Sequence, residues 1–346
     1  MTMWVVRNDR FDTELLTEGY VSTGWTEVGD LRALGDDREA VRAAVDTHWP
    51  EAKPRACAAW AGMLYRFAYE MAVGDVVIAP SSTTGTLSFG VVDGPYEFVA
   101  AADYGHRRRV RWVKTRTART LFPRDVLRAI GSISTLFRVS RFEDLFTEYM
   151  SSTTDEEFTS TSVVQEVREV DAPASAPDEA ETVTPRLASE VEQETVDSVL
   201  QVLLDAISHE QFEHFTADLL RALGYQARVT QLSGDGGVDV IAHRDPLGLE
   251  PPIIKVQCKH TAAQQGGPVV QQLLGALAPG ELGLFVSLGS FTPQAFALER
   301  THANLRLLGG SDIARHVLDH FDELPAAWRD LLPLRRVWVL DRDPSI

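Results

Sequence analysis

The spacing of apolar residues predicts that a helix begins the C-terminal half of the chain. Four apolar residues recur three or four positions apart and would form one buried stripe: Phe212, Phe215, Leu219 and Leu223. Ser208 precedes the stripe and can cap the helix together with Gln211, three residues later, in a capping box. Gly224 follows the last apolar residue and is suited to closing the helix.

Two short apolar runs follow this helix and predict a β-hairpin. The first, residues 234–241, reads Gly-Asp-Gly-Gly-Val-Asp-Val-Ile, and the second, residues 256–259, reads Val-Gln-Cys-Lys. Turn residues fill the interval between them. Later patterns predict a helix at 269–277, a strand at 282–288, a helix at 293–302 and a strand at 304–308. This order predicts an α/β domain with a mixed central sheet flanked by helices.

The N-terminal part alternates short β runs with two helical stretches. Strands are predicted at 3–7, 75–80, 87–92, 96–99 and 109–114, and helices at 37–48 and 54–71. Asp36 is placed to cap the first helix, and Pro54 suits the first turn of the second. Several short strands with inserted helices predict an α+β fold built on a small curled β-barrel.

A polar segment separates the two parts. Residues 151–194 are rich in Ser, Thr, Glu, Asp, Ala, Val and Pro, and Phe158 is their only aromatic residue. Such a composition buries too little apolar surface to offset chain entropy, so we expect a flexible linker. The predicted organisation is an N-terminal domain at 1–145, an acidic disordered linker at 146–197 and a C-terminal domain at 198–346.

The net charge of −17 does not exclude nucleic acid as a partner. Residues 141–200 carry 3 Lys and Arg against 16 Asp and Glu, whereas residues 1–140 carry 18 against 17. Local patches, not the total charge, attract a phosphate backbone.

The location of the protein is predicted from its cysteines and its apolar runs. Cys57 and Cys258 lie in different predicted domains, so we expect no structural disulfide and a cytoplasmic location. The N-terminus lacks the pattern of a signal peptide, and no run of eighteen apolar residues predicts a membrane span.

The predicted hairpin brings a carboxylate, an amide and an ammonium group together. Asp239 lies in the first run, and Gln257 follows eighteen residues later in the second. Because side chains alternate along a strand, Gln257 and Lys259 share one face, whereas Cys258 faces the core. Carboxylate and amide oxygens can hold a hard cation, and a lysine can activate water or stabilise negative charge. This favours metal-assisted phosphodiester hydrolysis; the alternatives are a turn role for Asp239 and a structural salt bridge for Lys259.

The Asp…Gln-x-Lys pattern resembles the PD-(D/E)xK nuclease motif, and residues 208–321 resemble the Mrr family of type IV restriction endonucleases. The resemblance rests on five features in order: Phe212-Glu213, residues 219–225, the Asp-Gly-Gly-Val-Asp turn, residues 256–259, and residues 284–287 with 291–295. It implies a metal-dependent endodeoxyribonuclease whose catalytic residues are Asp239, Gln257, Lys259 and the accessory acid Glu213. A solvated helix glutamate is the alternative for Glu213.

The same resemblance implies a cofactor, Mg²⁺, with Mn²⁺ as a substitute. Its ligands would be Asp239, Gln257 and the backbone carbonyl of Cys258. Gln257 stands where an acidic residue is common in the superfamily, and an amide binds a cation more weakly than a carboxylate does. This departure leaves an inactive, degenerate site open as an alternative.

Four segments of the N-terminal part resemble PUA-like and EVE-type reader domains: residues 4–6, 71–77, 89–96 and 106–112. Such domains are often fused to restriction nucleases, where they hold modified bases. The resemblance therefore implies an N-terminal DNA reader domain with a PUA-like barrel.

Basic and aromatic residues supply candidates for DNA contact in that domain. Alternate arginines of a strand point one way and would form a row that faces phosphates, within a cluster of basic candidates: Arg107, Arg109, Arg111, Lys114 and Arg116. The alternative is an edge strand protected by charge. The candidates for stacking on an extruded base are Trp25, Trp60, Tyr65, Phe89, Tyr96 and Trp112, with core packing as the alternative for each.

Together these patterns predict a modification-dependent, type IV-like restriction endonuclease whose N-terminal domain recognises modified double-stranded DNA by base flipping. One catalytic centre cuts one strand, so double-strand cleavage implies a homodimer or a larger homo-oligomer. Two alternatives stay open. One is a nuclease gated by a small signal molecule or RNA. The other is a non-catalytic DNA-binding sensor with a decayed nuclease fold.

Overall fold

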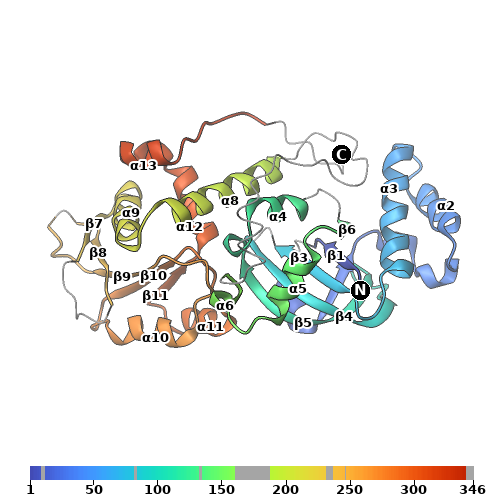
Figure 1. Ribbon diagram of the computed structural model, residues 1–346, viewed down its shortest axis with the longest axis horizontal. Coiled ribbons are helices and arrows are strands. Elements are labelled where there is room, and N and C mark those ends of the chain that lie inside the picture. Colours follow the sequence, from blue (N-terminus) through green and yellow to red (C-terminus); the bar gives the residue numbers. More distant parts are fainter. Residues whose placement is uncertain are drawn as a thin grey trace. The chain divides into compact units, whose positions relative to one another are not determined.

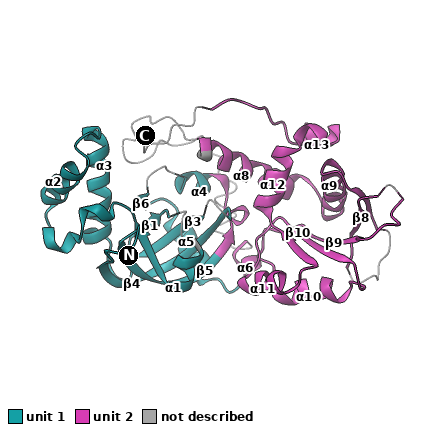
Figure 2. Cartoon of the chain, turned by 180° about the vertical axis from the view of Figure 1, so that it is seen from behind, with its two compact units in different colours: residues 1–115, 125–153, 162–177 teal, residues 116–124, 154–161, 178–346 magenta. Residues whose placement is uncertain are grey.

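The computed structural model describes residues 1–8, 12–81, 84–131, 135–159, 188–230, 237–245 and 247–339. These residues form two compact units (Figure 2). The N-terminal unit takes its residues from 1–115 and 125–153, and the C-terminal unit from 116–124, 154–159 and 188–339. The N-terminal half of the sequence therefore contributes two segments to the C-terminal unit.

The N-terminal unit is built on a six-stranded sheet, ordered β2-β5-β4-β3-β1-β6 among the described residues (Figure 1). The strands are β1 (Met3–Val6), β2 (Tyr20–Thr23), β3 (Val76–Ser81), β4 (Thr86–Phe98), β5 (His106–Ala118) and β6 (Leu136–Val139). The helices are α1 (Asp12–Glu18), η1 (Thr26–Val28), η2 (Leu31–Leu34), α2 (Arg38–His48), α3 (Pro54–Tyr65), η3 (Arg66–Glu70), α4 (Arg124–Ala129) and α5 (Glu143–Ser151). No pairing between described strands closes this sheet into a ring, so the predicted PUA-like barrel is not confirmed.

One long strand, β4, replaces the two strands predicted at 87–92 and 96–99. Gly94 and Pro95, which the sequence suggested as a turn, lie inside it. The pairing of β3 with β4 ends at Val91, so Pro95 lies beyond this ladder and its missing N–H removes no bond to β3. A Cβ at Gly94 would lie 3.1 Å from the Cβ of Arg109, so this position also favours glycine.

The helix predicted at 54–71 ends at Tyr65 and continues as one π-helical segment, η3. The buried guanidinium of Arg108 donates to the carbonyl oxygens of Phe67 (2.8 Å) and Ala68 (2.7 Å). A side chain that bonds carbonyls of the helix competes with the regular hydrogen-bond ladder and favours the wider π turn. Arg108 is therefore a structural residue of the N-terminal unit.

The C-terminal unit is an α/β domain, as predicted, with a five-stranded sheet ordered β11-β10-β9-β8-β7. The strands are β7 (Gln226–Val229), β8 (Val240–His243), β9 (Ile254–Lys259), β10 (Leu282–Ser287) and β11 (Leu305–Leu308). The helices are η4 (Arg119–Leu121), α6 (Asp155–Thr159), α8 (Ala188–Ala206), α9 (His209–Ala222), α10 (Gly267–Gly275), α11 (Pro293–Thr301), α12 (Gly310–Asp319), η5 (Phe321–Glu323) and α13 (Ala326–Leu331). β8 pairs antiparallel with β7 and β9, whereas β10 pairs in parallel with β9 and β11, which confirms the mixed sheet.

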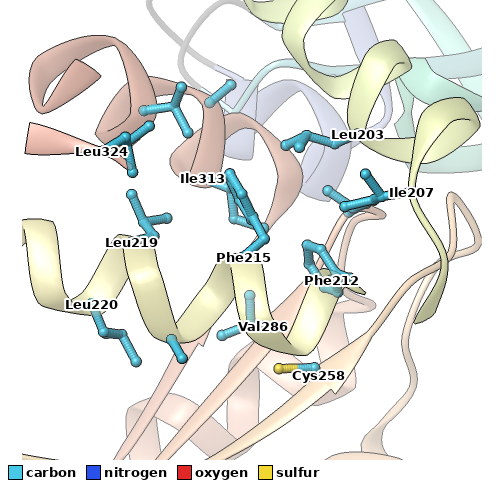
Figure 3. Close-up of a cluster of buried hydrophobic side chains, with 14 of the residues drawn as sticks. Leu203, Ile207, Phe212, Phe215, Leu219, Leu220, Cys258, Val286, Ile313 and Leu324 are labelled. Atoms are coloured by element: carbon cyan, nitrogen blue, oxygen red, sulfur yellow. The ribbon is translucent and has the colours of Figure 1, made fainter. Parts of the chain in front are cut away.

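Two hydrophobic cores cover the two faces of this sheet. On one face, side chains of α8, α9 and α12 pack against Cys258 and Val286 (Figure 3). On the other face, α10 and α11 pack against Phe285 of β10. The thiol of Cys258 therefore faces the core, as predicted. The predicted capping box of α9 is also present, because Ser208 and Gln211 exchange both hydrogen bonds.

Helices occupy both ends of the segment predicted as a disordered linker at 146–197. α5 and α6 occupy its beginning, and α8 starts at Ala188. Phe158 is fully buried, with its ring centroid 5.6 Å from that of Phe122, so even a polar segment contributes a core residue here. The prediction is therefore wrong at both ends. Residues 160–187 lie outside the described residues, and for them the linker stays a prediction. None of the described helices combines the length and the apolar character that crossing a bilayer requires.

Candidate active site

The carboxylate of Asp239 is fixed against the edge of β9. Its Oδ2 accepts a hydrogen bond from the backbone N–H of Cys258 at 2.6 Å. The backbone of Asp239 is held on both sides, because its N–H donates to Val256 O (2.8 Å) and its carbonyl accepts from Thr230 N (2.9 Å). The structure thus brings Asp239 and β9 together, as the hairpin prediction required.

Gln257 lies beside Asp239 on β9 and is only 3% exposed. Its Oε1 is buried and has no hydrogen-bond partner in the described part of the chain. A buried acceptor without a partner costs about 1–3 kcal/mol, so a ligand that supplied one would be favoured. Gly237 lies against this amide, since a Cβ there would be 3.0 Å from Gln257 Nε2, and its φ of +84° also favours glycine.

Glu213, on α9, lies close enough to Asp239 for the two carboxylates to repel each other. The pKa of Glu213 is raised above its ordinary value, first by burial and then by the charge of Asp239. His209 opposes this rise, with its Nε2 3.3 Å from Glu213 Oε1. The structure therefore places the predicted accessory acid with Asp239, although α9 and the hairpin are separate elements.

Lys259 ends β9 and is half-buried. Within the described ranges its ammonium makes no hydrogen bond or ion pair, so the structure does not support a structural salt bridge for it. Burial raises the pKa of the neighbouring Cys258 thiol, which suits a packing role. His260 has a structural role, since its Nε2 lies 2.9 Å from Leu203 O of α8.

The donor atoms around Asp239 fit a hard divalent cation. The carboxylates of Asp239 and Glu213 supply negative charge, and the partnerless Oε1 of Gln257 supplies a neutral oxygen. The N–H and the C=O of one residue point to the same edge of a strand, so the Cys258 carbonyl shares the edge where Asp239 binds. Among the described residues no cluster of three or more His, Cys, Asp and Glu could hold a metal. A cation here would therefore depend on Gln257, a backbone carbonyl, water and substrate oxygens.

The predicted arginine row is shorter in the structure and is flanked by acids. Arg107, Arg109 and Arg111 lie on one face of β5 and line an open cavity of about 510 Å³. The cavity is also lined by Glu18, Asp93 and Glu97. The guanidinium of Arg107 lies 4.2 Å from the centroid of the Tyr20 ring and 3.8 Å from the carboxylate of Glu14. The sequence pattern did not reveal these acids, because they come from other elements.

The other two basic residues of the predicted row lie elsewhere. Lys114 donates to Ser152 O (2.7 Å), and its ammonium lies 5.3 Å from the centroid of the Tyr149 ring. Arg116 belongs to the C-terminal unit, where its guanidinium lies 5.3 Å from the centroid of the Phe296 ring. Both residues thus have contacts within the protein, and a phosphate contact for either of them stays a prediction.

Two of the proposed base-pocket residues are core residues. Phe89 is fully buried between Phe146 and Tyr149, and Tyr96 is buried with its hydroxyl 2.7 Å from His106 Nδ1. Neither can stack on a base without repacking the core, so both assignments are wrong.

Trp25 and Trp60 do lie together, with ring centroids 6.1 Å apart. Trp49, which the sequence pattern did not indicate, lies 5.7 Å from Trp60. Trp25 has a left-handed backbone with φ of 62°, and its carbonyl oxygen lies 3.1 Å from His106 Nε2. Trp112 donates from Nε1 to Leu15 O, and the Tyr65 hydroxyl donates to Asp36, so neither belongs to this pair. A base-stacking role for these aromatic residues stays a prediction.

Two protein families match the two parts of the chain. Residues 204–317 match the family model of the Mrr catalytic domain, which is described as a restriction endonuclease. Residues 3–138 match a family described as a domain of unknown function. The type IV methyl-directed restriction enzyme EcoKMrr of Escherichia coli (strain K12) is 29% identical over 170 residues, which cover 44% of this chain and 54% of that enzyme. The chain therefore spans about half the length of this relative.

Solved structures of two restriction enzymes also match. The MspJI restriction endonuclease, in complex with a 27-mer oligonucleotide, is 15% identical, with a TM-score of 0.33 over 98% of this chain and 73% of that one. The DNA modification-dependent restriction endonuclease AspBHI is 14% identical, with a TM-score of 0.34 over 75% of this chain and 67% of that one. At TM-scores this low, neither likeness bears on the function of this chain. The family match and the relative from Escherichia coli support the mixed-sheet unit as a nuclease domain, within which residues 204–317 match the restriction endonuclease family.

Proposed function

We propose that this chain is a modification-dependent DNA endonuclease that cuts the phosphodiester backbone with a divalent cation, Mg²⁺ or Mn²⁺. The observation that carries the proposal is the grouping of Asp239, Gln257, Lys259 and Glu213 inside a domain that matches the restriction endonuclease family. The relative from Escherichia coli is named as methyl-directed, which makes a methylated base the first modification to test.

The residues of the site divide the chemistry among them. A bound divalent cation would supply Lewis-acid stabilisation of the charge that develops on the scissile phosphate. Asp239 and Gln257 would hold the cation, with the Cys258 carbonyl on the same strand edge. The ammonium of Lys259 is available to orient the attacking water and to stabilise negative charge. The raised pKa of Glu213 moves this carboxylate toward the range in which it accepts a proton at neutral pH.

The N-terminal unit would capture the DNA. Arg109 and Arg111 are exposed on β5 and can contact phosphates, which carry no sequence information. The three acids that line the same cavity balance the charge of its three arginines, so binding through this face would be weak and sensitive to salt. The pair formed by Trp25 and Trp60 is the candidate for contact with an extruded modified base. Cutting both strands would require two copies of the chain, as a homodimer or a larger assembly.

One cleavage experiment tests this function. The full-length protein would be incubated with Mg²⁺, Mn²⁺ or EDTA and with plasmids that carry methylated cytosine, methylated adenine or no modification. We expect metal-dependent cuts in at least one modified plasmid and little cutting of the plain plasmid. Binding without cleavage under every condition would instead identify a decayed nuclease. Cleavage of plain DNA that requires an added nucleotide or RNA would identify a ligand-gated nuclease.

A further inference from the structure

Gln264 connects the loop that follows Lys259 to both segments that the N-terminal half contributes to the C-terminal unit. Its backbone N–H donates to the carboxylate of Asp155 (2.9 Å), and its side-chain Nε2 donates to the carbonyl oxygen of Arg116 (3.1 Å). The same Nε2 lies 3.3 Å from Phe291 O. Gln264, five positions after Lys259, thus binds both segments, 116–124 and 154–159, to the same loop.

Arg116 is an unusual point of attachment. It lies within β5, the strand that carries Arg107, Arg109 and Arg111 a few residues earlier, and it has a left-handed φ of 55°. This conformation costs a non-glycine residue about 1–2 kcal/mol and persists only where the surroundings fix it. The stacking of its guanidinium on Phe296 and the bond from Gln264 to its carbonyl supply that restraint.

Asp155 ties the second segment to the same loop. It begins α6, where a carboxylate also favours the helix N-terminus. Phe158, one turn later, is fully buried in the C-terminal unit. A shift of α6 would therefore displace the acceptor of the Gln264 N–H.

A second connection reaches the other end of the loop. Arg119 and Asp197 form a two-pronged ion pair at 2.7–2.8 Å, and both side chains are 8% exposed. Asp197 lies on α8, and Leu203 O of the same helix binds the His260 ring. A buried ion pair is often no more stabilising than an apolar pair of similar volume, and one role proposed for retaining such pairs is to fix a unique arrangement. The residue after Lys259 is thus also tied, through α8, to the segment that follows β5.

We propose that Gln264 is a positioning residue that couples DNA capture on β5 to the placement of the Lys259 ammonium. This inference rests on the proposed function. Modified DNA bound at Arg109 and Arg111 restrains β5, the restraint passes through the backbone of Arg116 to Gln264, and the loop then holds Lys259 in its cutting position. Gln264 itself need not touch the DNA or the cation.

The test compares Gln264→Met in the full-length protein with Gln271→Ala, a matched change of an exposed glutamine on the neighbouring α10. Methionine keeps the size of the side chain and removes the bonds that Nε2 makes to the carbonyl oxygens of Arg116 and Phe291. Binding affinity and single-turnover cleavage rates would be measured on methylated and plain duplexes with Mg²⁺. We expect Gln264→Met to bind the methylated duplex within twofold of wild type and to cut it at least tenfold more slowly. Its rate on plain duplex should change less than twofold, so the preference is lost, whereas Gln271→Ala should behave as wild type.

Each other result overturns the inference in a distinct way. If Gln264→Met still cuts the methylated duplex faster than the plain duplex, as wild type does, the coupling does not pass through this residue. An equal loss of rate on both duplexes shows that Gln264 only supports the nuclease fold. If the wild-type protein cuts neither duplex, or both equally, the proposed function itself fails and the inference fails with it.

Hydrogen exchange on the wild-type protein provides an independent test, should Gln264→Met fold poorly. The coupling predicts slower exchange of the amides in residues 259–266 when methylated duplex binds in EDTA, where no cleavage occurs. Unchanged exchange of these amides, with the duplex bound, would overturn the proposal.

Discussion

The backbone N–H of Cys258 donates to the carboxylate of Asp239 across 2.6 Å, and this bond determines both the architecture and the chemistry of the site. The pairing of β8 with β9 ends at Val240 and Val256, so in the described part of the chain it is the Asp239 side chain that accepts from the next strand donor, the Cys258 N–H. The same carboxylate is the strongest candidate ligand for a cation. Its position therefore does not depend on the cation being bound, which favours a preorganised site.

This double role predicts different outcomes for two substitutions of Asp239. Asp239→Asn keeps an oxygen for the Cys258 N–H and removes the charge, so we expect a near-native melting temperature and a loss of cleavage of about 10²-fold or more. Asp239→Ala removes both, so it should also lose about 1–3 kcal/mol of unfolding free energy. Thermal melts and single-turnover cleavage would separate the two effects. Wild-type cleavage by Asp239→Asn in excess Mg²⁺ would disprove the assignment.

Gly237 predicts a more local disruption of the site. Alanine there would have a strained φ of +84° and a Cβ 3.0 Å from Gln257 Nε2. Gly224→Ala is the matched control, because φ is +88° at that position and nothing lies within 4 Å of its Cβ. We expect both variants to lose about 1 kcal/mol of unfolding free energy from backbone strain, and only Gly237→Ala to lose cleavage. Equal cleavage by the two variants would show that the Gln257 amide is not needed in its present position.

Local chemistry made much of the C-terminal unit predictable. The capping box at Ser208 and the alternation along β9 are properties of neighbouring residues, so they can be read from the chain. The proximity of Asp239 and Gln257 followed from a single hairpin. The position of Glu213 beside Asp239 came only from the resemblance to the Mrr family, because no local rule places α9 against the hairpin.

Long-range features could not be predicted, because they depend on residues that are far apart in the sequence. Arg119 pairs with Asp197, 78 residues away, and nothing near either residue reveals the partner. The acids around Arg109 and the packing of Trp49 on Trp60 likewise depend on how separate elements meet. Phe158 belongs to a polar stretch whose average composition suggested disorder, and composition does not show that one residue is buried.

The raised pKa of Glu213 predicts a stability effect with a definite sign. Burial and the Asp239 charge favour the protonated acid in the folded protein, so ionised Glu213 destabilises the fold at pH values above both its unfolded and folded pKa. Below the unfolded pKa both states are protonated and the effect disappears. Glu213→Gln should therefore raise the melting temperature of the metal-free protein at pH 7, with a gain that shrinks toward pH 4.

Two comparisons make this prediction specific. Glu210→Gln, an exposed acid in the first turn of the same helix, should give no gain at pH 7. Added Mg²⁺ should stabilise the wild type more than Glu213→Gln, because a bound cation removes the repulsion between Glu213 and Asp239. A lower melting temperature for Glu213→Gln at pH 7 without metal would contradict the repulsion that we infer.

The two segments that join the C-terminal unit predict how the chain behaves once it is nicked. The polar composition of residues 160–187 makes this stretch the expected site of the first proteolytic cuts. The resulting pieces should still elute together in gel filtration, because residues 116–124 and 154–159 supply buried parts of the C-terminal unit, among them Arg119 and Phe158.

Arg119→Leu would leave the Asp197 carboxylate buried without its partner, at a cost of about 3–5 kcal/mol, so its nicked pieces should separate. The double variant Arg119→Leu with Asp197→Leu removes both charges and should keep the pieces together. Arg42→Leu, which breaks the exposed pair with Asp46, should have no effect on elution. Separation of the nicked wild-type pieces would show that these two segments do not hold the chain together.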